Sequence, residues 1–405
     1  MKKSENQKEW QEVQQLAAER ILQEENCNDE KALRIIEEIA FQFGREKNAR
    51  DLYQMIRRIY GRMRGPLGEL SYLLEDRNIN EIMINGPDRV FIERRGELEE
   101  VEDGYSSVAE LEKTIRKIAG RVHREINERQ PILDARLEDG SRVNAVLGTV
   151  AIGGPVLTVR RFSEGGLSVQ KMIEGGTISP PCAEDLRDLV IAGYNIFVSG
   201  GTSSGKTTFL NTLSDFLPAG ERVVVIEDSI ELNLRHVINN VRLECRNANA
   251  AGTGEINMDD LIKASLRMRP DRIIVGEVRG KEVSSMLQAL NTGHSGMSTG
   301  HGNSVEGMLR RLEAMYISGA DIPLDAVRMQ IVEAVDVMVH MARLPDGSRR
   351  VVAVKELTSY ENGQYRLHSL YEMDKDLRLS YTGCHLKNDM KLRLRGIRNA
   401  RLQNI

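Results

Sequence analysis

The sequence predicts an α/β protein whose larger, carboxyl-terminal part is a mostly parallel sheet with helices on its faces. Strand-like and helix-like segments alternate from Leu167 onward, the pattern typical of such sheets. A glycine-rich turn, GGTSSGKT, separates an apolar strand from a helix within this region. Residues 1–64 instead carry apolar residues at helical spacing. We therefore expect a helical extension over 1–64, a smaller α+β domain over 65–164 and the α/β domain over 165–405.

The helical extension carries three apolar stripes, around residues 10–17, 33–43 and 52–59. We interpret them as packing surfaces between short helices or against another subunit. An arginine cluster closes the region, comprising Arg57, Arg58, Arg62 and Arg64. We interpret this cluster as a solvated helix face, with contact to lipid headgroups or to a partner as the alternative.

The α+β domain is expected to contain several strands and one helix. Strand-like runs lie at 79–85, 90–93, 132–137, 142–147 and 156–161, and a helix is predicted over 107–122. The turn EDGS joins two of these runs into a hairpin. Serine and glycine then dominate Ser163–Ser168, which reads as an interdomain linker.

The α/β domain is predicted in more detail. Strands are expected at 196–199, 222–227, 239–244, 272–276 and 296–300, with helices at 258–268, 281–292, 304–316 and 323–334. The pattern then returns to β structure, at 335–344 and 350–357.

The turn GGTSSGKT has the G-x-x-x-x-G-K-[ST] spacing of a phosphate-binding loop, in the required context of strand, turn and helix. Backbone N–H groups of such a loop point at phosphate oxygens, at the positive end of the helix dipole. We expect Lys206 to reach the β- and γ-phosphates and the Thr207 hydroxyl to bind Mg²⁺. The predicted nucleotide-binding residues are Gly200, Gly201, Thr202, Ser203, Ser204, Gly205, Lys206, Thr207 and Thr208.

Hydrolysis also needs a carboxylate beside the γ-phosphate. Glu277 follows the apolar strand RIIV, and we assign it to orient and deprotonate the attacking water. Gly276 stands where many such proteins carry the Mg²⁺-binding Asp. Glu227 ends a second apolar strand, and Asp228 and Glu231 follow it, so these acids are placed near the cation. The expected metal ligands are Thr207, Glu227 and Glu277, partly through water.

Two histidines flank the last predicted strand of this site, in the run GHSGMSTGH. A histidine beside a γ-phosphate could donate a hydrogen bond and report the loss of that phosphate. His301 is assigned this role, while for His294 and His301 alike a purely structural role is equally open.

Composition excludes several classes of function. The formal charge is −4 and there is no basic, aromatic-laced strip, so nucleic acid is not an expected partner. The four cysteines are scattered and read as reduced thiols without metal spacing. No apolar run approaches the roughly 18 to 20 residues that span a bilayer, and the amino terminus lacks the apolar centre of a secretory signal. We expect a cytoplasmic protein, peripheral to the cytoplasmic face of the inner membrane at most.

Four ordered runs resemble the type II/type IV secretion ATPase superfamily: GGTSSGKTT, VVVIEDSIEL, RMRPDRIIVGEVRG and TGHSGMSTGHGNS. They correspond to its Walker A, Asp box, Walker B and His box. The runs NINEIMINGPDRVFIERRGELE and PILDARLEDGSRVNAVL resemble, within it, the CpaF branch that powers assembly of tight-adherence (Flp-type) pili.

This resemblance implies a hexameric ring of subunits, each with a sensor-like domain hinged to a RecA-like P-loop NTPase domain. ATP and Mg²⁺ are the implied cofactors, and an inner-membrane platform protein is the implied partner. Basic residues of the sensor-like domain close over the phosphates in the family. Arg142 and Arg160 match these catalytic positions, with Arg161 as a substitute for Arg160.

Two other functions stay open. A DNA-translocating, conjugation-type ATPase would use the same motor domain, and DNA-stimulated hydrolysis would distinguish it. A ring that holds nucleotide as a scaffold without turnover would bind ATP and release no phosphate.

Overall fold

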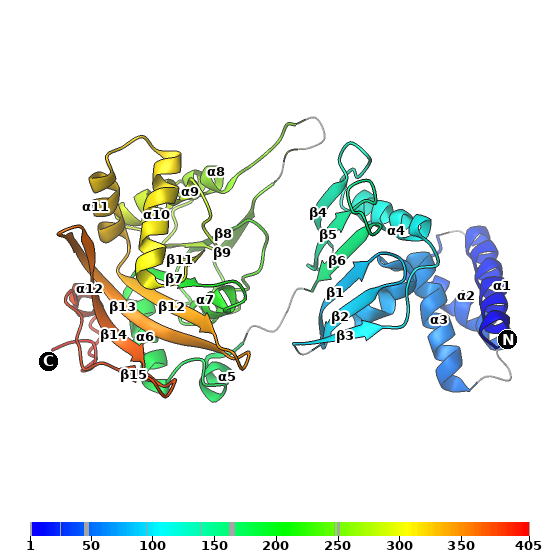
Figure 1. The fold of residues 1–405 in the computed structure, drawn as a ribbon, viewed down its shortest axis with the longest axis horizontal. Coiled ribbons are helices and arrows are strands. Elements are labelled where there is room, and N and C mark those ends of the chain that lie inside the picture. The colour runs from blue at the N-terminus through cyan, green and yellow to red at the C-terminus, as the bar shows by residue number, and fades with distance from the viewer. Residues whose placement is uncertain are drawn as a thin grey trace. The chain divides into compact units, whose positions relative to one another are not determined.

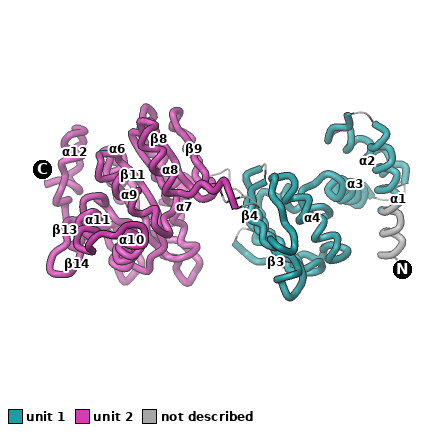
Figure 2. Tube along the Cα trace, turned by 90° about the horizontal axis from the view of Figure 1, so that it is seen from above, with its two compact units in different colours: residues 1–163 teal, residues 164–405 magenta. Residues whose placement is uncertain are grey.

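The computed structural model describes residues 2–24, 26–43, 48–94, 96–137, 139–161, 167–246, 248 and 252–404 (Figure 1). The chain divides into two compact units, residues 1–163 and 164–405, shown in different colours in Figure 2, and each is described by itself. The linker expected over Ser163–Ser168 falls largely outside the described residues, because 162–166 are not among them.

The first unit begins with three helices: α1 (Lys2–Gln23), α2 (Asp29–Phe43) and α3 (Ala49–Arg64). Helix α3 starts where the Asn48 side chain accepts a hydrogen bond from the backbone N–H of Asp51, which satisfies one of the free donors at a helix start. The predicted stripes face one another, since Val13, Ile36 and Met55 are all fully buried in one apolar cluster. The extension therefore has a small core of its own.

The arginines of α3 are not a solvated face. Arg57 forms an ion pair with Glu75, Arg58 lies 2.5 Å from Asp103, and Arg62 lies 3.3 Å from Glu69. All three acids belong to the part of the chain that follows α3. These ion pairs therefore fasten the helical extension to the α+β domain, and the interpretation of these three side chains as a solvated face was wrong.

A six-stranded antiparallel sheet, counted over the described residues, makes up the rest of this unit. Its order is β3-β2-β1-β6-β5-β4, and α4 and the short 3-10 helix η1 pack on one face through residues such as Leu70, Leu111 and Ile115. The bounds are η1 (Gly68–Glu75), β1 (Ile79–Asn85), β2 (Val90–Arg94), β3 (Glu97–Val101), α4 (Val108–Arg121), β4 (Ile132–Arg136), β5 (Arg142–Val146) and β6 (Val156–Arg160).

The second unit is built on a sheet that has nine strands within the described residues, in the order β15-β14-β13-β12-β7-β11-β10-β8-β9. Strands β12, β7, β11, β10, β8 and β9 run parallel to one another. Strands β13, β14 and β15 continue the sheet from β12 as an antiparallel meander. Its strands are β7 (Ile196–Gly200), β8 (Val223–Glu227), β9 (Asn240–Glu244), β10 (Arg272–Val275), β11 (Ser295–His301), β12 (Val337–Arg343), β13 (Arg349–Glu361), β14 (Gln364–Met373) and β15 (Leu379–Tyr381). Its helices are α5 (Val169–Glu174), α6 (Pro180–Ala192), α7 (Lys206–Ser214), α8 (Met258–Ser265), α9 (Glu282–Asn291), α10 (Val305–Gly319), α11 (Leu324–Ala334) and α12 (Met390–Leu394).

Two apolar cores lie on opposite faces of this sheet. Consecutive residues of a strand point to opposite faces, so Val198 joins one core and Phe197 the other. The first core includes residues of α6 and α7, and the second includes residues of α8 to α11. Burial on both faces explains why β7, β8 and β10 are largely apolar.

The carboxyl-terminal segment is held by buried polar groups. Asp185 of α6 is 1% exposed and accepts hydrogen bonds from Tyr371, Asn399 and Arg401. Glu356 of β13 is 3% exposed and accepts from backbone N–H groups of Lys387 and Asn388. Among the described helices, none is both long and apolar enough to cross a membrane.

Candidate nucleotide site

The loop after β7 has the backbone conformation that phosphate binding requires. Gly205 has φ +90°, Ser203 has φ +58°, and a Cβ on Gly200 would lie 2.5 Å from the carbonyl oxygen of Met341. Glycine is therefore required at 200 by space and favoured at 205 by conformation. Helix α7 begins at Lys206, and residues 201–203 stay exposed. The loop thus forms a cradle at a helix start, which is a ready anion site.

Lys206 is buried, at 7% exposure, in a position suited to a ligand with several negative charges. Its Nζ donates to the carbonyl oxygen of Gly201 at 2.9 Å and lies 3.3 Å from Nδ1 of His301. Burial lowers its pKa, and the negative charge of Glu277 opposes that effect. A phosphate in the cradle would supply the counter-charge that this ammonium lacks.

Glu227 ends β8 and is 3% exposed. Its Oε1 accepts from the backbone N–H groups of Glu231 and Leu232, at 2.9 and 3.0 Å, whereas Oε2 is buried without a partner. Burial raises the pKa of Glu227 to about 7, although the two N–H donors lower it. A buried carboxylate oxygen without a partner is the kind of atom that a cation or an ordered water satisfies.

Glu277 lies beyond the end of β10, between a histidine and an arginine. Its Oε2 accepts from Nη2 of Arg279 at 2.7 Å and from Nε at 3.1 Å. Its Oε1 lies 2.8 Å from Nε2 of His301 but accepts no hydrogen bond of good geometry, and it is buried. One oxygen of this carboxylate is thus held, and the other remains available as a proton acceptor.

His301 links the carboxylate to the lysine. It is the last residue of β11, and its two ring nitrogens face Glu277 and Lys206. Burial lowers its pKa, Glu277 opposes this, and the cations Lys206 and Arg279 add to it. A neutral imidazole is therefore favoured here near pH 7, with one nitrogen as donor and the other as acceptor.

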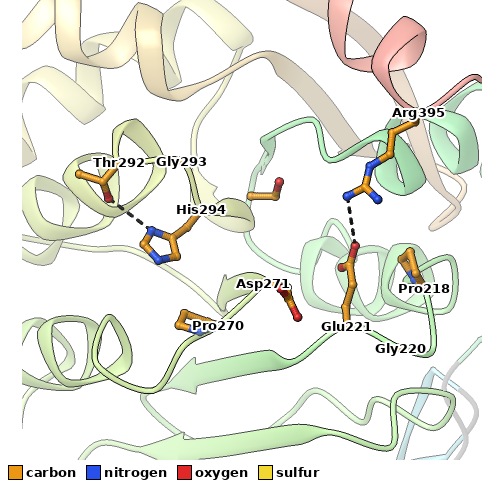
Figure 3. Close-up of a pocket in the computed structure, with 10 residues that line it drawn as sticks. Pro218, Gly220, Glu221, Pro270, Asp271, Thr292, Gly293, His294 and Arg395 are labelled. Atoms are coloured by element: carbon orange, nitrogen blue, oxygen red, sulfur yellow. Dashed lines mark hydrogen bonds and ion pairs between the residues drawn. The ribbon is translucent and has the colours of Figure 1, made fainter.

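His294 does not join this cluster, because it precedes the first residue of the same strand. Its Nδ1 lies 3.2 Å from the carbonyl oxygen of Ala289 and 3.3 Å from the hydroxyl of Thr292. It lines a polar pocket that also includes Glu221 and Arg395 (Figure 3). Six residues of β11 lie between the two histidines, and the seven steps from one to the other correspond to about 23 Å at the rise of a strand. For both histidines a structural role was left open, and only His301, the one assigned to the site, lies beside Lys206 and Glu277.

The arginines expected from the resemblance lie in the first unit. Arg142 and Arg160 pair directly across β5 and β6, and Arg136 pairs with Arg142 across β4 and β5. Directly opposite side chains share a face, with Cβ atoms about 4.5 to 5.5 Å apart. Three cations therefore stand in a row on the face opposite α4. Arg161 is engaged elsewhere, since its guanidinium donates to the carbonyl oxygen of Asp76.

Mg²⁺ and a nucleoside triphosphate fit the donors at this site. The free Oε2 of Glu227 and the Thr207 hydroxyl at the start of α7 are oxygen donors, which suit Mg²⁺, and Glu277 would reach the cation through water. Within the described residues no group of three acidic, histidine or cysteine side chains forms a metal cage. Phosphate oxygens and water would therefore complete the coordination, as is usual for Mg²⁺ at nucleotide sites.

The sequence analysis did not identify two residues at the site, Arg279 and His340. Arg279 follows Glu277 by two residues in the run GEVRG, and its proximity to an assigned base was the only available signal. His340 of β12 lies opposite Ser199, and its Nδ1 is 2.8 Å from the Ser199 hydroxyl, immediately before the phosphate-binding loop. That contact depends on which strand lies beside β7, and no local pattern reveals it.

Comparisons with known proteins agree with this geometry. The family model described as "Type II/IV secretion system protein" matches residues 67–387. The conjugal transfer protein TrbB of Rhizobium radiobacter is 32% identical over 326 residues, covering 79% of this chain and 96% of TrbB. An uncharacterised protein of Methanocaldococcus jannaschii is 44% identical over 241 residues, covering 57% of this chain but only 33% of that protein.

A solved structure supports the fold. The Legionella pneumophila ATPase DotB superposes with a TM-score of 0.51 at 21% identity, covering 73% of this chain and 81% of DotB. The expected architecture of an α+β domain followed by a RecA-like P-loop domain is confirmed by this likeness. The match over most of the chain, together with the phosphate loop and the carboxylates beside it, shows that the chain belongs to the type II/IV secretion system ATPase superfamily.

Proposed function

We propose that the protein hydrolyses Mg-ATP and acts as the cytoplasmic motor of a pilus-assembly or type II/IV secretion machine. The observation that carries this proposal is the convergence of Lys206, His301 and Glu277 from three separate motifs. Their side chains form one chain of contacts, with separations of 3.3 Å (Lys206 to His301) and 2.8 Å (His301 to Glu277). These contacts bring a cation (Lys206), a hydrogen-bonding sensor (His301) and a base (Glu277) together beside the phosphate-binding loop.

Each side chain has a defined task in this mechanism. The loop N–H groups and Lys206 would hold the β- and γ-phosphates, and Thr207 and Glu227 would hold the cation. Oε1 of Glu277 accepts a proton from the attacking water, since Oε2 is already engaged by Arg279. His301 touches both Lys206 and Glu277, so it responds when either contact changes. Mg²⁺, when bound, neutralises charge on the phosphates.

We further propose that ATP draws the two units of a subunit together. Arg142 and Arg160 would meet the phosphates from the first unit, because a guanidinium matches phosphate oxygens bidentately. Loss of the γ-phosphate would release these contacts and let the units separate about Ser163–Ser168. In a homo-oligomer, which we propose is a hexamer, such strokes would act on an inner-membrane platform protein. The protein would then contact the membrane machine from the cytoplasmic side.

Two variants test the hydrolytic proposal. Lys206→Ala should lose nucleotide binding, because the buried cation is the main counter-charge in the cradle. Glu277→Gln should bind ATP and hydrolyse it very slowly, since an amide cannot take a proton from water. Binding is measured with a fluorescent nucleotide and hydrolysis by phosphate release, on protein of verified oligomeric state. Wild-type turnover by Glu277→Gln would remove this residue from the catalytic role.

A second candidate is a conjugation-type ATPase that moves DNA. The name of TrbB, which matches 79% of this chain, favours it. The resemblance of two runs in the first unit to the CpaF branch and the net charge of −4 favour the pilus motor instead. Single-stranded DNA that binds in a salt-sensitive way and stimulates hydrolysis would support the DNA-translocating function. Nucleotide binding without any phosphate release would instead indicate a scaffold.

A further inference from the structure

Arg279 contacts two of the acids at the nucleotide site through all three of its guanidinium nitrogens. Nε and Nη2 lie 3.1 and 2.7 Å from Oε2 of Glu277, and Nη1 lies 3.5 Å from Oδ2 of Asp228. Asp228 follows β8 and Glu277 follows β10, so this one side chain spans the ends of two neighbouring strands. Both donors that reach Glu277 bind the same oxygen, Oε2, and hold that end of the carboxylate.

The two oxygens of Glu277 differ as a result. Oε2 accepts two hydrogen bonds from Arg279, whereas Oε1 is buried, accepts none and faces Nε2 of His301 at 2.8 Å. A carboxylate that could rotate would present either oxygen to the water, in many orientations. A carboxylate held at Oε2 presents Oε1 alone.

We propose that Arg279 is a positioning residue that selects Oε1 of Glu277 as the proton acceptor, with Asp228 orienting Arg279 in turn. This inference rests on the proposed hydrolysis. In that reaction the water oxygen bonds to the γ-phosphorus and its proton passes to Oε1. The bond from phosphorus to the β–γ bridging oxygen breaks, and its electron pair stays on ADP. Arg279 acts through Glu277 and touches neither water nor phosphate.

The ion pair itself contributes little to folding. The Arg279 side chain is 59% exposed and the Glu277 side chain 19%, and exposed pairs of this kind stabilise proteins weakly. Arg393 and Asp389 form a matched pair, with side-chain exposures of 60% and 18% and a 2.8 Å contact, on a different element. Arg393→Ala is therefore a control that removes an equivalent ion pair away from the site.

The experiment compares Arg279→Ala, Arg279→Lys and Arg393→Ala with wild type, each checked for oligomeric state and melting temperature. Arg279→Ala should lower kcat about 10- to 100-fold, as expected when a base loses its alignment, with KM and affinity for a non-hydrolysable ATP analogue unchanged. Arg279→Lys should recover part of the rate, because an ammonium supplies the charge without the fork. Arg393→Ala should keep the wild-type rate.

A second comparison places Arg279→Ala in the Glu277→Gln background, where it should cause no further loss, because both changes disable one group. An unchanged kcat in Arg279→Ala would overturn the inference. If Arg279→Ala lost more affinity for the ATP analogue than for ADP, relative to wild type, Arg279 would contact the γ-phosphate directly and the inference would be overturned. A further loss of rate in the double variant would overturn it as well. If wild-type protein releases no phosphate, the proposed function itself fails and this inference fails with it. Hydrolysis that needs Glu277 but not Arg279 would refute the positioning role alone.

Discussion

Burial shifts three ionisable groups of the candidate site toward their neutral forms. It lowers the pKa of Lys206 and of His301 and raises the pKa of Glu227 to about 7. In the protein without ligand, keeping Lys206 protonated and Glu227 ionised therefore costs free energy. A polyanion beside Lys206 and a cation beside Glu227 would restore both charged forms, so binding free energy is concentrated on the complete metal–nucleotide pair.

His340 allows a test of burial at a residue without a metal-binding role. Burial lowers its pKa, and its Nδ1 lies 2.8 Å from the Ser199 hydroxyl. The unfolded chain then binds more protons than the folded one just below pH 6.5, so the free energy of unfolding falls as pH drops through that range.

The variant His340→Asn should remove this part of the pH dependence, because an amide can donate to or accept from the Ser199 hydroxyl and does not titrate. Urea denaturation at several pH values between about 5 and 8 measures it, in the range where histidine titrates. An identical pH slope in variant and wild type would contradict the assignment.

Sequence patterns identify residues of the site that belong to local motifs. Lys206 and Glu277 follow from spacing and from the apolar strand before each of them. Arg279 and His340 do not, since their roles depend on side-chain rotation and on which strands are neighbours. The separation of His294 from His301 is also hidden, because a short run of letters does not show that the ends of a strand are far apart.

At the scale of elements, burial decides how well a strand can be predicted. Strand β7 was expected at 196–199 and ends at Gly200, because an apolar run buried on both faces has a clear start and end. Strand β3 was not expected. None of its residues is buried, and three of its five residues are glutamate. Strands β14 and β15, toward the edge of the second sheet, were missed because their partly exposed residues give no continuous apolar run.

The turn after β10 yields a prediction about packing. A Cβ on Gly276 would lie 2.9 Å from Cγ of Glu227 and 3.3 Å from its Oε1. Gly276→Ala should therefore displace Glu227, lower stability by about 1 to 3 kcal/mol as overpacking does, and reduce ATP hydrolysis. Thermal unfolding and phosphate release measure the two effects.

The matched control is Gly120→Ala in helix α4, where a Cβ would meet nothing within 4 Å. That change should raise stability by about 0.5 to 1 kcal/mol, the usual gain in a helix. A Gly276→Ala protein with unchanged stability and activity would show that Glu227 moves aside freely.

At the scale of the whole molecule, the candidate groups are divided between two units. The phosphate loop and its acids belong to residues 164–405, while the arginine row of β4, β5 and β6 belongs to residues 1–163. In the proposed closure, a polyanion that meets this row would contact three guanidinium groups on one face of the sheet.

Alanine variants of Arg142 and Arg160 test this division of labour. Each should still bind nucleotide, because the cradle is intact, and each should hydrolyse it at least about tenfold more slowly, since an arginine that stabilises transferring phosphate contributes far more than that. Arg77→Ala, an exposed arginine of the same unit, serves as the control. Unchanged rates would exclude the arginine row from catalysis.

Subunit assembly gives a further prediction. Native mass measurement should show a hexamer that a non-hydrolysable ATP analogue stabilises, because a ligand that binds only the closed form favours that form. The Lys206→Ala variant should show no such response. A protein that stays monomeric with the analogue would contradict the ring.

The close approach of Gly276 to Glu227 restricts which pairs of residues this site can hold. A long side chain at 276 would overlap the side chain of Glu227, because a Cβ at 276 already lies 2.9 Å from its Cγ. A carboxylate at one of these strand ends therefore requires a small residue at the other. Exchanging them as a pair should preserve a working cation site, whereas changing either alone should not.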